Sequence, residues 1–453
     1  IAERAHTHLR IRLRHLAPRS MPEPRPCAFS VFPPTPPSAR PGVFDGTISP
    51  PLANWWPDRT GLESTPVPHW LIVSGSARAL AHSCVAAGWT CDVIDPFADT
   101  DTRALARRTV RADFRDGAFG DDLPALITGL AEGCDGLVAG SGFERRPDLL
   151  SALDLALQAS VLRIGNAAAT VQRCKAPDSL AAGLQQAGVR FAAMRSEGRA
   201  PEGWLMKQTG ACGGAHVRPV RSGETIAPGW HVQAYVAGIP ASVLFLADGQ
   251  RGRIVGISRQ FPGAIAGPYA WCEAVSDLPL DDAQQAALER DVDAIVQAFG
   301  LRGLNGADLV LQGGRHVLLE INPRPTATLA LYENRVEGGL FAAHVAACAG
   351  RLNDVVLSPS RTRRGLRVVY APHDLVIGHG VRWPGGCTDL PAAGSLVAKA
   401  TPVCTAHAAG HDENSVRTQL QQRHEEVLHR IALSAGAVAT DHNNDLVIPR
   451  RSA

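Results

Sequence analysis

The sequence predicts a mixed α/β fold divided into several domains. Short apolar strands alternate with helices from His69 onwards, and a β-hairpin is centred on Gly313 and Gly314. An amphipathic helix between Asp281 and Gly300 precedes that hairpin. At 453 residues the chain is long enough for about two to four domains. Hydrophobic residues form 45% of it and charged residues 19%, which is ample for a globular core.

Charge and cysteine content argue against several classes of protein. The formal net charge of +2 gives no reason to expect nucleic acid or a membrane surface as a partner. No apolar run reaches the length of about 18 residues that a membrane-spanning helix needs. Ten cysteines are scattered without a CxxC pair, which indicates reduced thiols rather than a disulfide framework or a zinc site. We therefore expect a cytoplasmic protein.

Residues 1–66 do not resemble a domain. They are first rich in arginine and histidine and then run through Pro33-Pro34-Thr35-Pro36-Pro37. Proline at this density prevents regular helix and sheet, so we expect a disordered extension. The arginine-rich opening resembles a transit peptide, and a reading frame that extends upstream of a true start near Met21 explains it at least as well. We assign this extension no function.

A strand and helix alternation follows the extension. Trp70–Val73 is a short buried strand, a helix comes next, and Thr90–Ile94 is the second strand. Gly136–Gly140 continues the same sheet, and the loop after it carries Glu144 and Arg145, which either touch a substrate or pair with each other. The turn after the first strand lacks the glycines of a dinucleotide-binding fingerprint, so it is weak evidence for a cofactor.

The scarcity of lysine singles out two positions. The 45 basic residues include only three lysines, Lys175, Lys207 and Lys399. Lys207 ends an apolar strand-like run that starts at Trp204, and a glycine-rich loop, residues 210–216, follows it. Glycines let backbone N–H groups approach phosphate oxygens, and a compact ammonium adds a point charge. For each lysine taken alone, an ordinary surface position is the alternative.

The hairpin carries the most specific signal for chemistry. Its runs are Ala307–Leu311 and His316–Glu320, and a three-residue loop between them places Asp308 directly opposite Glu320. Asn322 then shares the face of Glu320, because side chains alternate along a strand. Two facing carboxylates repel each other by up to roughly 1 kcal/mol, and a hard cation such as Mg²⁺ removes that cost. A solvated sheet face with acids placed by chance is the alternative.

A family resemblance emerges when these pieces are taken in order. Arg324 follows the acids in the string Glu320-Ile321-Asn322-Pro323-Arg324, and a guanidinium beside a metal–phosphate site stabilises transition-state charge. Together with Lys175, the strand of Lys207, the glycine loop and the linker 233–238, this order resembles the ATP-grasp superfamily over roughly residues 68–410. Within it, the chain is most similar to predicted ATP-dependent carboligases related to biotin carboxylase.

The resemblance implies a role for each matching residue. The hinge reads Gln-Ala-Tyr-Val from Gln233, where relatives often carry an acidic residue near adenine, so the amide of Gln233 would serve instead. His216 either orients phosphate or substrate or stabilises the glycine loop. The expected ATP-binding residues are Lys175, Lys207, Gly210, Gly213, Gly214, His216, Gln233, Tyr235 and Val236, the expected ligands of Mg²⁺ or Mn²⁺ are Asp308, Glu320 and Asn322, and the expected catalytic residues are Arg324 and Lys207.

The resemblance also implies how the chain is divided. The extension 1–66 is followed by a Rossmann-like pre-ATP-grasp domain, residues 67–165, that helps to form the acceptor pocket. The ATP-grasp domain, residues 166–350, binds the nucleotide and the metal ion. A small β-rich domain with a terminal helix, residues 351–453, completes the chain.

The activity implied by the resemblance is ATP-dependent ligation of a small-molecule carboxylic acid to an amine. The acid becomes an acyl-phosphate, and ADP and phosphate are released. Some relatives are associated with tetrahydromethanopterin-linked one-carbon metabolism, so cofactor biosynthesis is the expected setting. Two alternatives stay open, namely activation of bicarbonate for carboxylation and a nucleotide-binding scaffold without catalysis. A homodimer is also left open, and the sequence identifies neither the acid nor the amine.

Overall fold

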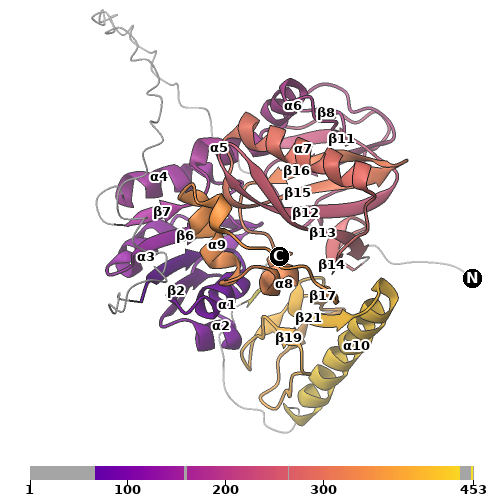
Figure 1. Ribbon diagram of the computed structural model, residues 1–453. Coiled ribbons are helices and arrows are strands. Elements are labelled where there is room, and N and C mark those ends of the chain that lie inside the picture. Colours follow the sequence, from indigo (N-terminus) through magenta and orange to yellow (C-terminus); the bar gives the residue numbers. More distant parts are fainter. Residues whose placement is uncertain (1–66, 158–160, 264, 439–449, 452–453) are drawn as a thin grey trace, which may run out of the picture. The chain divides into compact units, whose positions relative to one another are not determined.

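The computed structural model describes residues 67–157, 161–263, 265–438 and 450–451 (Figure 1). The expected extension 1–66 lies outside the described residues. Two sheets carry most of the described fold, one of five strands and one of eight, and a four-stranded sheet stands beside the larger one. No helix in the described ranges is both long and apolar enough to cross a membrane.

The first sheet confirms the predicted alternation of strands and helices. Its five strands are all parallel and lie in the order β3-β2-β1-β6-β7. The strand order reverses between β1 and β6, and ligands of such sheets bind where the carboxyl ends of the strands part at this reversal. The bounds are β1 His69–Val73, β2 Thr90–Asp95, β3 Thr109–Arg111, β6 Gly136–Ala139 and β7 Leu162–Ile164.

Helices cover both faces of this sheet. α3, Leu123–Ala131, and α4, Pro147–Leu157, pack on one face, while α1, Arg78–Ala86, packs on the other. A helix from much later in the chain, α9 at Gly339–Cys348, joins α1 and is buried along its whole length. α9 also contacts β12 and β15 of the larger sheet, so one core links the two sheets.

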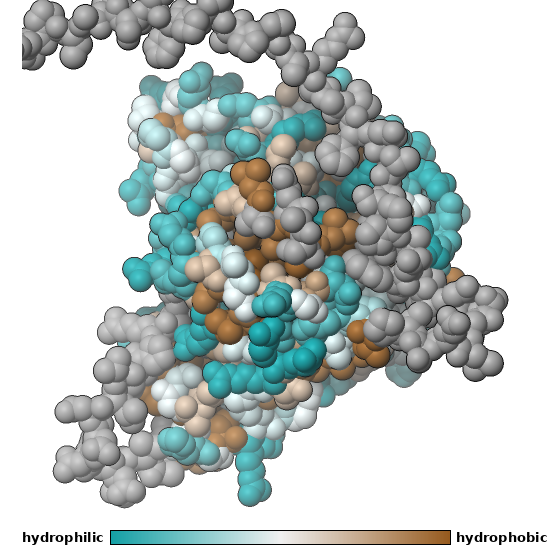
Figure 2. All heavy atoms as spheres, turned by 90° about the vertical axis from the view of Figure 1, so that its left-hand side faces the viewer, coloured by the Kyte–Doolittle hydropathy of each residue, from teal (hydrophilic) through white to brown (hydrophobic). Residues whose placement is uncertain are grey.

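Smaller elements complete this first region. α2, Thr100–Leu105, follows β2, and a two-stranded hairpin is formed by β4, Phe114–Arg115, and β5, Ala118–Phe119. Figure 2 shows one side of the molecule, on which a group of hydrophobic residues lies in the middle of the view among hydrophilic ones. Nothing described shows what covers that group, so we assign it no function.

Two helices lead from the first region to the four-stranded sheet. α5, Ala168–Lys175, ends at the first of the two singled-out lysines, and α6, Pro177–Gln186, starts immediately after it. The antiparallel sheet has the order β10-β9-β11-β8. Its bounds are β8 Met194–Arg195, β9 Trp204–Gln208, β10 Arg218–Pro219 and β11 Trp230–Ala234.

The eight-stranded sheet has the order β16-β15-β12-β13-β14-β17-β21-β19. The predicted helix behind the hairpin is α7, Asp282–Phe299, which begins with a capping box at Asp281 and ends at the left-handed Gly300. Its apolar side packs against the hairpin, as expected. The bounds are β12 Ile239–Asp248, β13 Gly252–Gly263, β14 Ala270–Ser276, β15 Arg302–Gln312, β16 Arg315–Asn322, β17 Arg363–Tyr370, β19 Cys387–Thr388 and β21 Pro402–Gly410.

The C-terminal strands belong to this same sheet. β17 pairs with β14, and β21 pairs with both β17 and β19. The expected terminal helix is α10, Glu413–Val438, which packs on β17 and β21. The remaining elements are α8 Leu329–Tyr332, two 3₁₀ turns at Glu333–Arg335 and Leu352–Asp354, and the short strands β18 Leu375–Val376, β20 Leu396–Val397 and β22 Arg450–Arg451.

The turn of the hairpin differs from the expected three-residue loop. Gln312 pairs with Arg315, so only Gly313 and Gly314 form the turn, and both have positive φ as a two-residue type I′ turn requires. The pairing of Asp308 with Glu320 is nevertheless confirmed. A register shift after Asp308 leaves one additional residue on β16 and restores the expected partner.

Candidate active site

The oxygen-bearing side chains of the hairpin meet on one face. The Asn322 amide nitrogen, Nδ2, donates to Asp308 Oδ2 and to Glu320 Oε1, both at 3.1 Å. Asn322 Oδ1 accepts a 2.7 Å hydrogen bond from Lys175 Nζ. The other oxygen of Asp308 accepts from Gln260 Nε2 at 3.0 Å, a partner on β13 that the sequence did not suggest. The three expected metal ligands are therefore neighbours.

Two lysines hold Glu320 between them. Lys175 Nζ lies 3.8 Å from Glu320 Oε1, and Lys207 Nζ lies 3.9 Å from Glu320 Oε2. Burial raises the pKa of Glu320, but the two ammonium groups outweigh burial and hold that pKa well below its usual range. Burial and the neighbouring Glu320 raise the pKa of Asp308. The expected strand position of Lys207 is confirmed, because β9 contains it.

The donor set fits a hard divalent cation. Two carboxylates and one amide oxygen are oxygen ligands of the kind that Mg²⁺ and Mn²⁺ prefer, and no thiol or imidazole is among these three residues. The two carboxylates face each other across the strands, and the side-chain NH₂ group of Asn322 donates to both. A cation at this place would relieve their repulsion.

A cavity of about 390 Å³ opens beside these groups, between the four-stranded sheet and the hairpin. Of the residues expected to bind ATP or metal, it is lined by Lys175, Lys207, Gly210, His216, Gln233 and Glu320. The others do not line it, namely Gly213, Gly214, Tyr235, Val236, Asp308 and Asn322, and the Tyr235 side chain is exposed. Eight other lining residues were not among the expected site residues, namely Cys174, Pro177, Leu180, Met194, Gln208, Ala211, His231 and Leu319.

Gln233 holds the lysine in place. Its Nε2 donates to the Leu319 carbonyl at 2.8 Å, and its Oε1 accepts from Lys207 Nζ at 3.1 Å. Both ends of the amide are thus engaged by the protein, and Gln233 is almost fully buried. Gln233 was expected to contact adenine, and in the structure its side chain orients the ammonium group of Lys207.

Two neutral histidines line the same cavity. Burial, with Lys207 nearby, lowers the pKa of His216 to about 4 and that of His231 to about 4. Both are therefore uncharged at neutral pH and able to donate one N–H group each. His231 Nδ1 lies 3.1 Å from the Thr209 hydroxyl oxygen, which fixes its ring. His231 lies directly opposite Lys207 in the β9–β11 pair, and this pairing is what would have identified His231 as a site residue.

The glycine-rich loop lies against the hairpin between β13 and β14. The Gly213 carbonyl accepts a 2.8 Å hydrogen bond from the Trp271 backbone N–H. At Gly214, with φ of +74°, an added Cβ would lie 2.1 Å from the Tyr269 carbonyl oxygen. Only glycine permits this close approach. The loop is therefore held over the cavity by contacts that depend on its missing side chain.

Arg324 pairs with Glu144 from the first sheet. Arg324 Nε donates to Glu144 Oε1, and Glu144 Oε2 accepts from the Gly142 backbone N–H at 2.7 Å. Burial raises the pKa of Glu144, but Arg324 and Lys175 outweigh burial and lower it. Glu144 therefore pairs with Arg324 and not with Arg145, which donates to the Asp116 carbonyl. Contact of this loop with a substrate stays a prediction.

Comparison with protein families identifies the central region. Residues 179–328 match the family model of the ATP-grasp domain. The protein contains an ATP-grasp domain. The matched range includes the glycine loop, both acids of the hairpin and Arg324, and it leaves out Lys175. The mixed α/β architecture is that of the ATP-grasp fold, as the sequence predicted.

Solved structures extend the likeness in fold over most of the chain. An L-amino acid ligase from Bacillus licheniformis matches with a TM-score of 0.59 at 12% identity, covering 80% of this chain and 98% of that one. A biotin carboxylase from Campylobacter jejuni, solved with β-γ-ATP, gives 0.60 at 11%, covering 82% and 95%. N5-carboxyaminoimidazole synthetase from Staphylococcus aureus gives 0.56 at 12%, covering 79% and 97%. At these identities the likeness shows the fold. No curated protein matches the chain.

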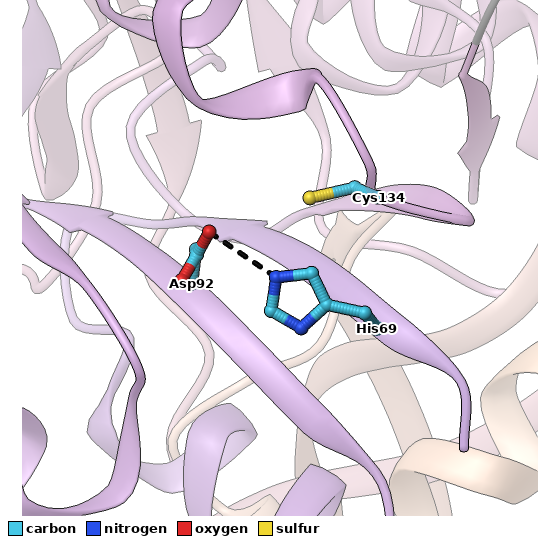
Figure 3. A group of neighbouring side chains, drawn as sticks. All are labelled: His69, Asp92 and Cys134. Atoms are coloured by element: carbon cyan, nitrogen blue, oxygen red, sulfur yellow. Dashed lines mark hydrogen bonds and ion pairs between the residues drawn. The ribbon is translucent and has the colours of Figure 1, made fainter. Parts of the chain in front are cut away.

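A second group of polar side chains lies at the opposite end of the first sheet. His69, Asp92 and Cys134 are buried neighbours, the only such group of three metal-ligand residue types in the described ranges (Figure 3). Asp92 Oδ2 already accepts from Arg108 Nη2 at 2.5 Å and lies 3.2 Å from His69 Nε2. Burial raises the pKa of the Cys134 thiol to about 11, and the thiol donates to the Leu130 carbonyl. This arrangement is a buried ion-pair cluster with a protonated thiol beside it.

Proposed function

We propose that this ATP-grasp protein is an ATP-dependent ligase that joins a small-molecule carboxylic acid to an amine and releases ADP and phosphate. The observation that carries the proposal is the convergence of Lys175 and Lys207 on Glu320 in a cavity of about 390 Å³. Ammonium groups placed against acids that would hold a metal ion are the arrangement that a nucleotide triphosphate requires. The ligase among the solved structures supports the reaction class.

The residues around the cavity divide the work. Lys175 and Lys207 would neutralise the charge of the phosphates, so that the carboxylate of the acid can approach the γ-phosphorus. Asp308, Glu320 and Asn322 would hold Mg²⁺ or Mn²⁺, which supplies further neutralisation of phosphate charge. Arg324 would stabilise the acyl-phosphate, since its guanidinium can bind phosphate oxygens through two parallel hydrogen bonds. The glycine loop would exclude water, which otherwise hydrolyses that intermediate.

Neutral donors complete the nucleotide site. His216 and His231 would donate to phosphate or ribose oxygens without adding charge to a cavity that already holds two ammonium groups. Apolar walls formed by Leu180, Met194 and Leu319 would accommodate the adenine ring. We propose that the ligase acts in cofactor or one-carbon metabolism of the tetrahydromethanopterin type. The identity of the acid that supports turnover tests this part of the proposal.

The test is release of ADP by the full chain with MgATP and a panel of small acids and amines. Turnover that requires one acid and one amine, and that disappears in Glu320→Ala, supports the ligase. Turnover that requires bicarbonate instead, with its carbon retained in the product, would replace ligation by carboxylation. Tight binding of MgATP without turnover on any pair would overturn the proposal in favour of a nucleotide-binding scaffold.

A further inference from the structure

The Glu144–Arg324 pair lies at a second cavity. This cavity has a volume of about 320 Å³ and lies where β6 and β7 end, beside the ordered loop that carries Arg324. Both members of the pair are largely withdrawn from solvent, with 3% of the Glu144 side chain and 13% of the Arg324 side chain exposed. The carboxyl ends of strands next to a reversal of strand order are the usual site of ligands in such sheets.

The other polar residues that line the cavity have structural partners. Arg163 pairs with Asp154 and donates to the Asn166 carbonyl. Asn166 donates to Asn305 Oδ1 at 2.7 Å and to the Pro323 carbonyl at 2.9 Å, and thereby joins the first sheet to the hairpin. The charged groups left to act on a ligand are those of Glu144 and Arg324, and the apolar wall is made by Phe143, Leu150, Ile164 and Val171.

We propose that Glu144 binds the ammonium group of the amine substrate and accepts its proton when the amide bond forms. This inference rests on the proposed ligase function and names the chemical class of its nucleophile. The substrate is an amine with an apolar substituent that matches the apolar wall of this cavity.

The argument follows from the charge of the pair. An acyl-phosphate bound by Arg324 would draw the guanidinium away from Glu144, and a buried carboxylate without a counter-ion is costly. An ammonium group replaces the lost cation. Bicarbonate or another anionic nucleophile would meet the Glu144 carboxylate with the same sign of charge, so the cavity selects against it. The apolar wall favours the uncharged part of an amine over water.

The covalent step balances without a further reactant. The lone pair of the amine nitrogen forms the C–N bond to the acyl carbon. The bond from that carbon to the phosphate oxygen breaks, and phosphate leaves with its electron pair. The ammonium group first gives one proton to the Glu144 carboxylate, which passes it to solvent, and this leaves the nitrogen with its lone pair. The departing phosphate takes the second proton that the nitrogen loses as the amide forms. Nothing is oxidised or reduced.

The surroundings of Glu144 give it the means to act as a base. The charged and titratable groups that face it are Arg324, Lys175 and Cys212. Burial alone raises the pKa of this carboxyl group, and Arg324 is the strongest influence that lowers it. When Arg324 turns to the acyl-phosphate, burial dominates and Glu144 becomes the stronger base at the moment that a proton must be taken.

The experiment compares two nucleophiles on the full chain. Hydroxylamine is already uncharged at neutral pH and traps an acyl-phosphate as a hydroxamate, whereas an alkylamine is protonated and needs a base. Wild-type protein is first assayed with MgATP, hydroxylamine and a panel of acids. Absence of hydroxamate with every acid would overturn the ligase function itself, which separates that failure from failure of the present inference.

Glu144→Gln is then compared with wild type at pH 7.5, with an acid that gives hydroxamate in the first assay. We expect amide formation with the alkylamine to fall at least 100-fold and hydroxamate formation to fall less than tenfold. Equal losses with both nucleophiles would reduce Glu144 to a residue that only positions Arg324, and would overturn the inference. Asp154→Asn, which removes a carboxylate from Arg163 beside the same cavity, is the matched control and should leave the ratio of the two rates unchanged.

A pH profile and a second variant give readouts that a loss of folded protein would not change. In Glu144→Gln only the free amine reacts, so its rate with the alkylamine should rise about tenfold per pH unit between pH 7 and 9, while wild type is much flatter. Parallel profiles would contradict the role of Glu144 as a base.

Leu150→Phe narrows the cavity and should lower the rate with a bulky amine at least tenfold more than the rate with methylamine. An equal change for both amines would place the amine elsewhere.

Discussion

Asp92 and Glu144 are two buried carboxylates in the same α/β region, each bound by an arginine, and they lie towards opposite ends of one sheet. Asp92 shares its charge with Arg108, whose side chain is 52% exposed, and with His69 (Figure 3). Glu144 is bound by Arg324, and both of these side chains are buried next to a cavity. The first pair therefore reaches solvent through its cation, while the second is enclosed.

The difference teaches what distinguishes a structural ion pair from one that can work on a ligand. The Asp92 cluster fixes the start of β1 to β2, and its residues line neither of the two cavities described above. The Glu144 pair belongs to a larger set, in which Lys175, Lys207 and Arg324 face Asp308, Glu320 and Glu144. Three cations and three carboxylates match in number, so any anion that enters redistributes their contacts.

The largest effect should come from Glu320→Gln. Removing the charge leaves Lys175 and Lys207 without their shared carboxylate and takes one ligand from the metal site. We expect ADP release to fall about 1000-fold or more, equivalent to about 4 kcal/mol in the barrier. The measurement is single-substrate turnover beside far-UV circular dichroism. A loss below tenfold would contradict the placement of the metal ion, and Gln285→Glu on the exposed side of α7 is a charge-change control.

Asp92→Asn tests the structural half of the comparison. It removes the counter-charge of Arg108 and the charged hydrogen-bond partner of His69 inside the sheet, so the free energy of unfolding should fall by about 2–4 kcal/mol, while turnover per folded molecule stays the same. Urea denaturation at pH 7 measures the loss. Asp148→Asn breaks an exposed pair with Arg146 and should cost about 1 kcal/mol or less. Equal losses in the two variants would show that the Asp92 cluster is not stabilising.

Asp95 sharpens the comparison, because it is a buried carboxylate on the same strand, β2, that accepts hydrogen bonds from the backbone N–H groups of Phe97 and Ala98. Burial, with Asp389 nearby, raises the pKa of Asp95 to about 6. The folded state thus holds a proton that the unfolded state releases near pH 4, so this contribution to stability is full at low pH and is lost as pH rises through about 6.

The corresponding measurement is urea denaturation between pH 4 and 7.5 for wild type and Asp95→Asn. The asparagine keeps the oxygen that accepts from both backbone groups and cannot titrate. We expect wild type to lose about 1–3 kcal/mol relative to the variant over this range. Parallel curves for the two proteins would mean that Asp95 titrates at its ordinary pKa.

The smallest effect distinguishes two neighbouring glycines. Gly213 and Gly214 both have positive φ, so alanine strains the backbone at either position, but only at Gly214 does a Cβ meet another backbone atom, the Tyr269 carbonyl oxygen. We expect Gly214→Ala to raise the KM for MgATP about tenfold more than Gly213→Ala, which is about 1.4 kcal/mol. Equal effects would mean that the loop acts without docking on the β13–β14 hairpin.

Local chemistry was enough to predict much of the site. The apolar run that starts at Trp204 placed Lys207 on a strand, and Asp281 and Gly300 bounded α7 correctly. The pairing of Asp308 with Glu320 was also confirmed, although through a two-residue turn and a register shift rather than the expected loop. Glycine patterns specify turn chemistry, but a sequence does not reveal where a strand carries one residue more than its partner.

What could not be predicted depends on contacts between distant segments. Gln260 meets Asp308 because β12 pairs with both β13 and β15, and nothing near Gln260 in the sequence points to the acids. Met194 and His231 enter the cavity through the pairing of β8, β9 and β11 in the same way. The spacing of Ser258 and Gln260 after the apolar residues Ile254 and Val255 was the available hint, since polar residues two apart share one face of a strand.

The eight-stranded sheet limits where the protein can be truncated, because it contains strands from before and after residue 350. β14 forms hydrogen bonds with β13 on one side and with β17 on the other, from Glu273 to Val275. A fragment that stops at residue 350 would expose that edge and would also lose α10 from the apolar cluster that includes Val275. Bare strand edges recruit other chains, so such a fragment would precipitate rather than behave as a portable nucleotide-binding module. Fusion partners and affinity tags at this end therefore belong beyond α10.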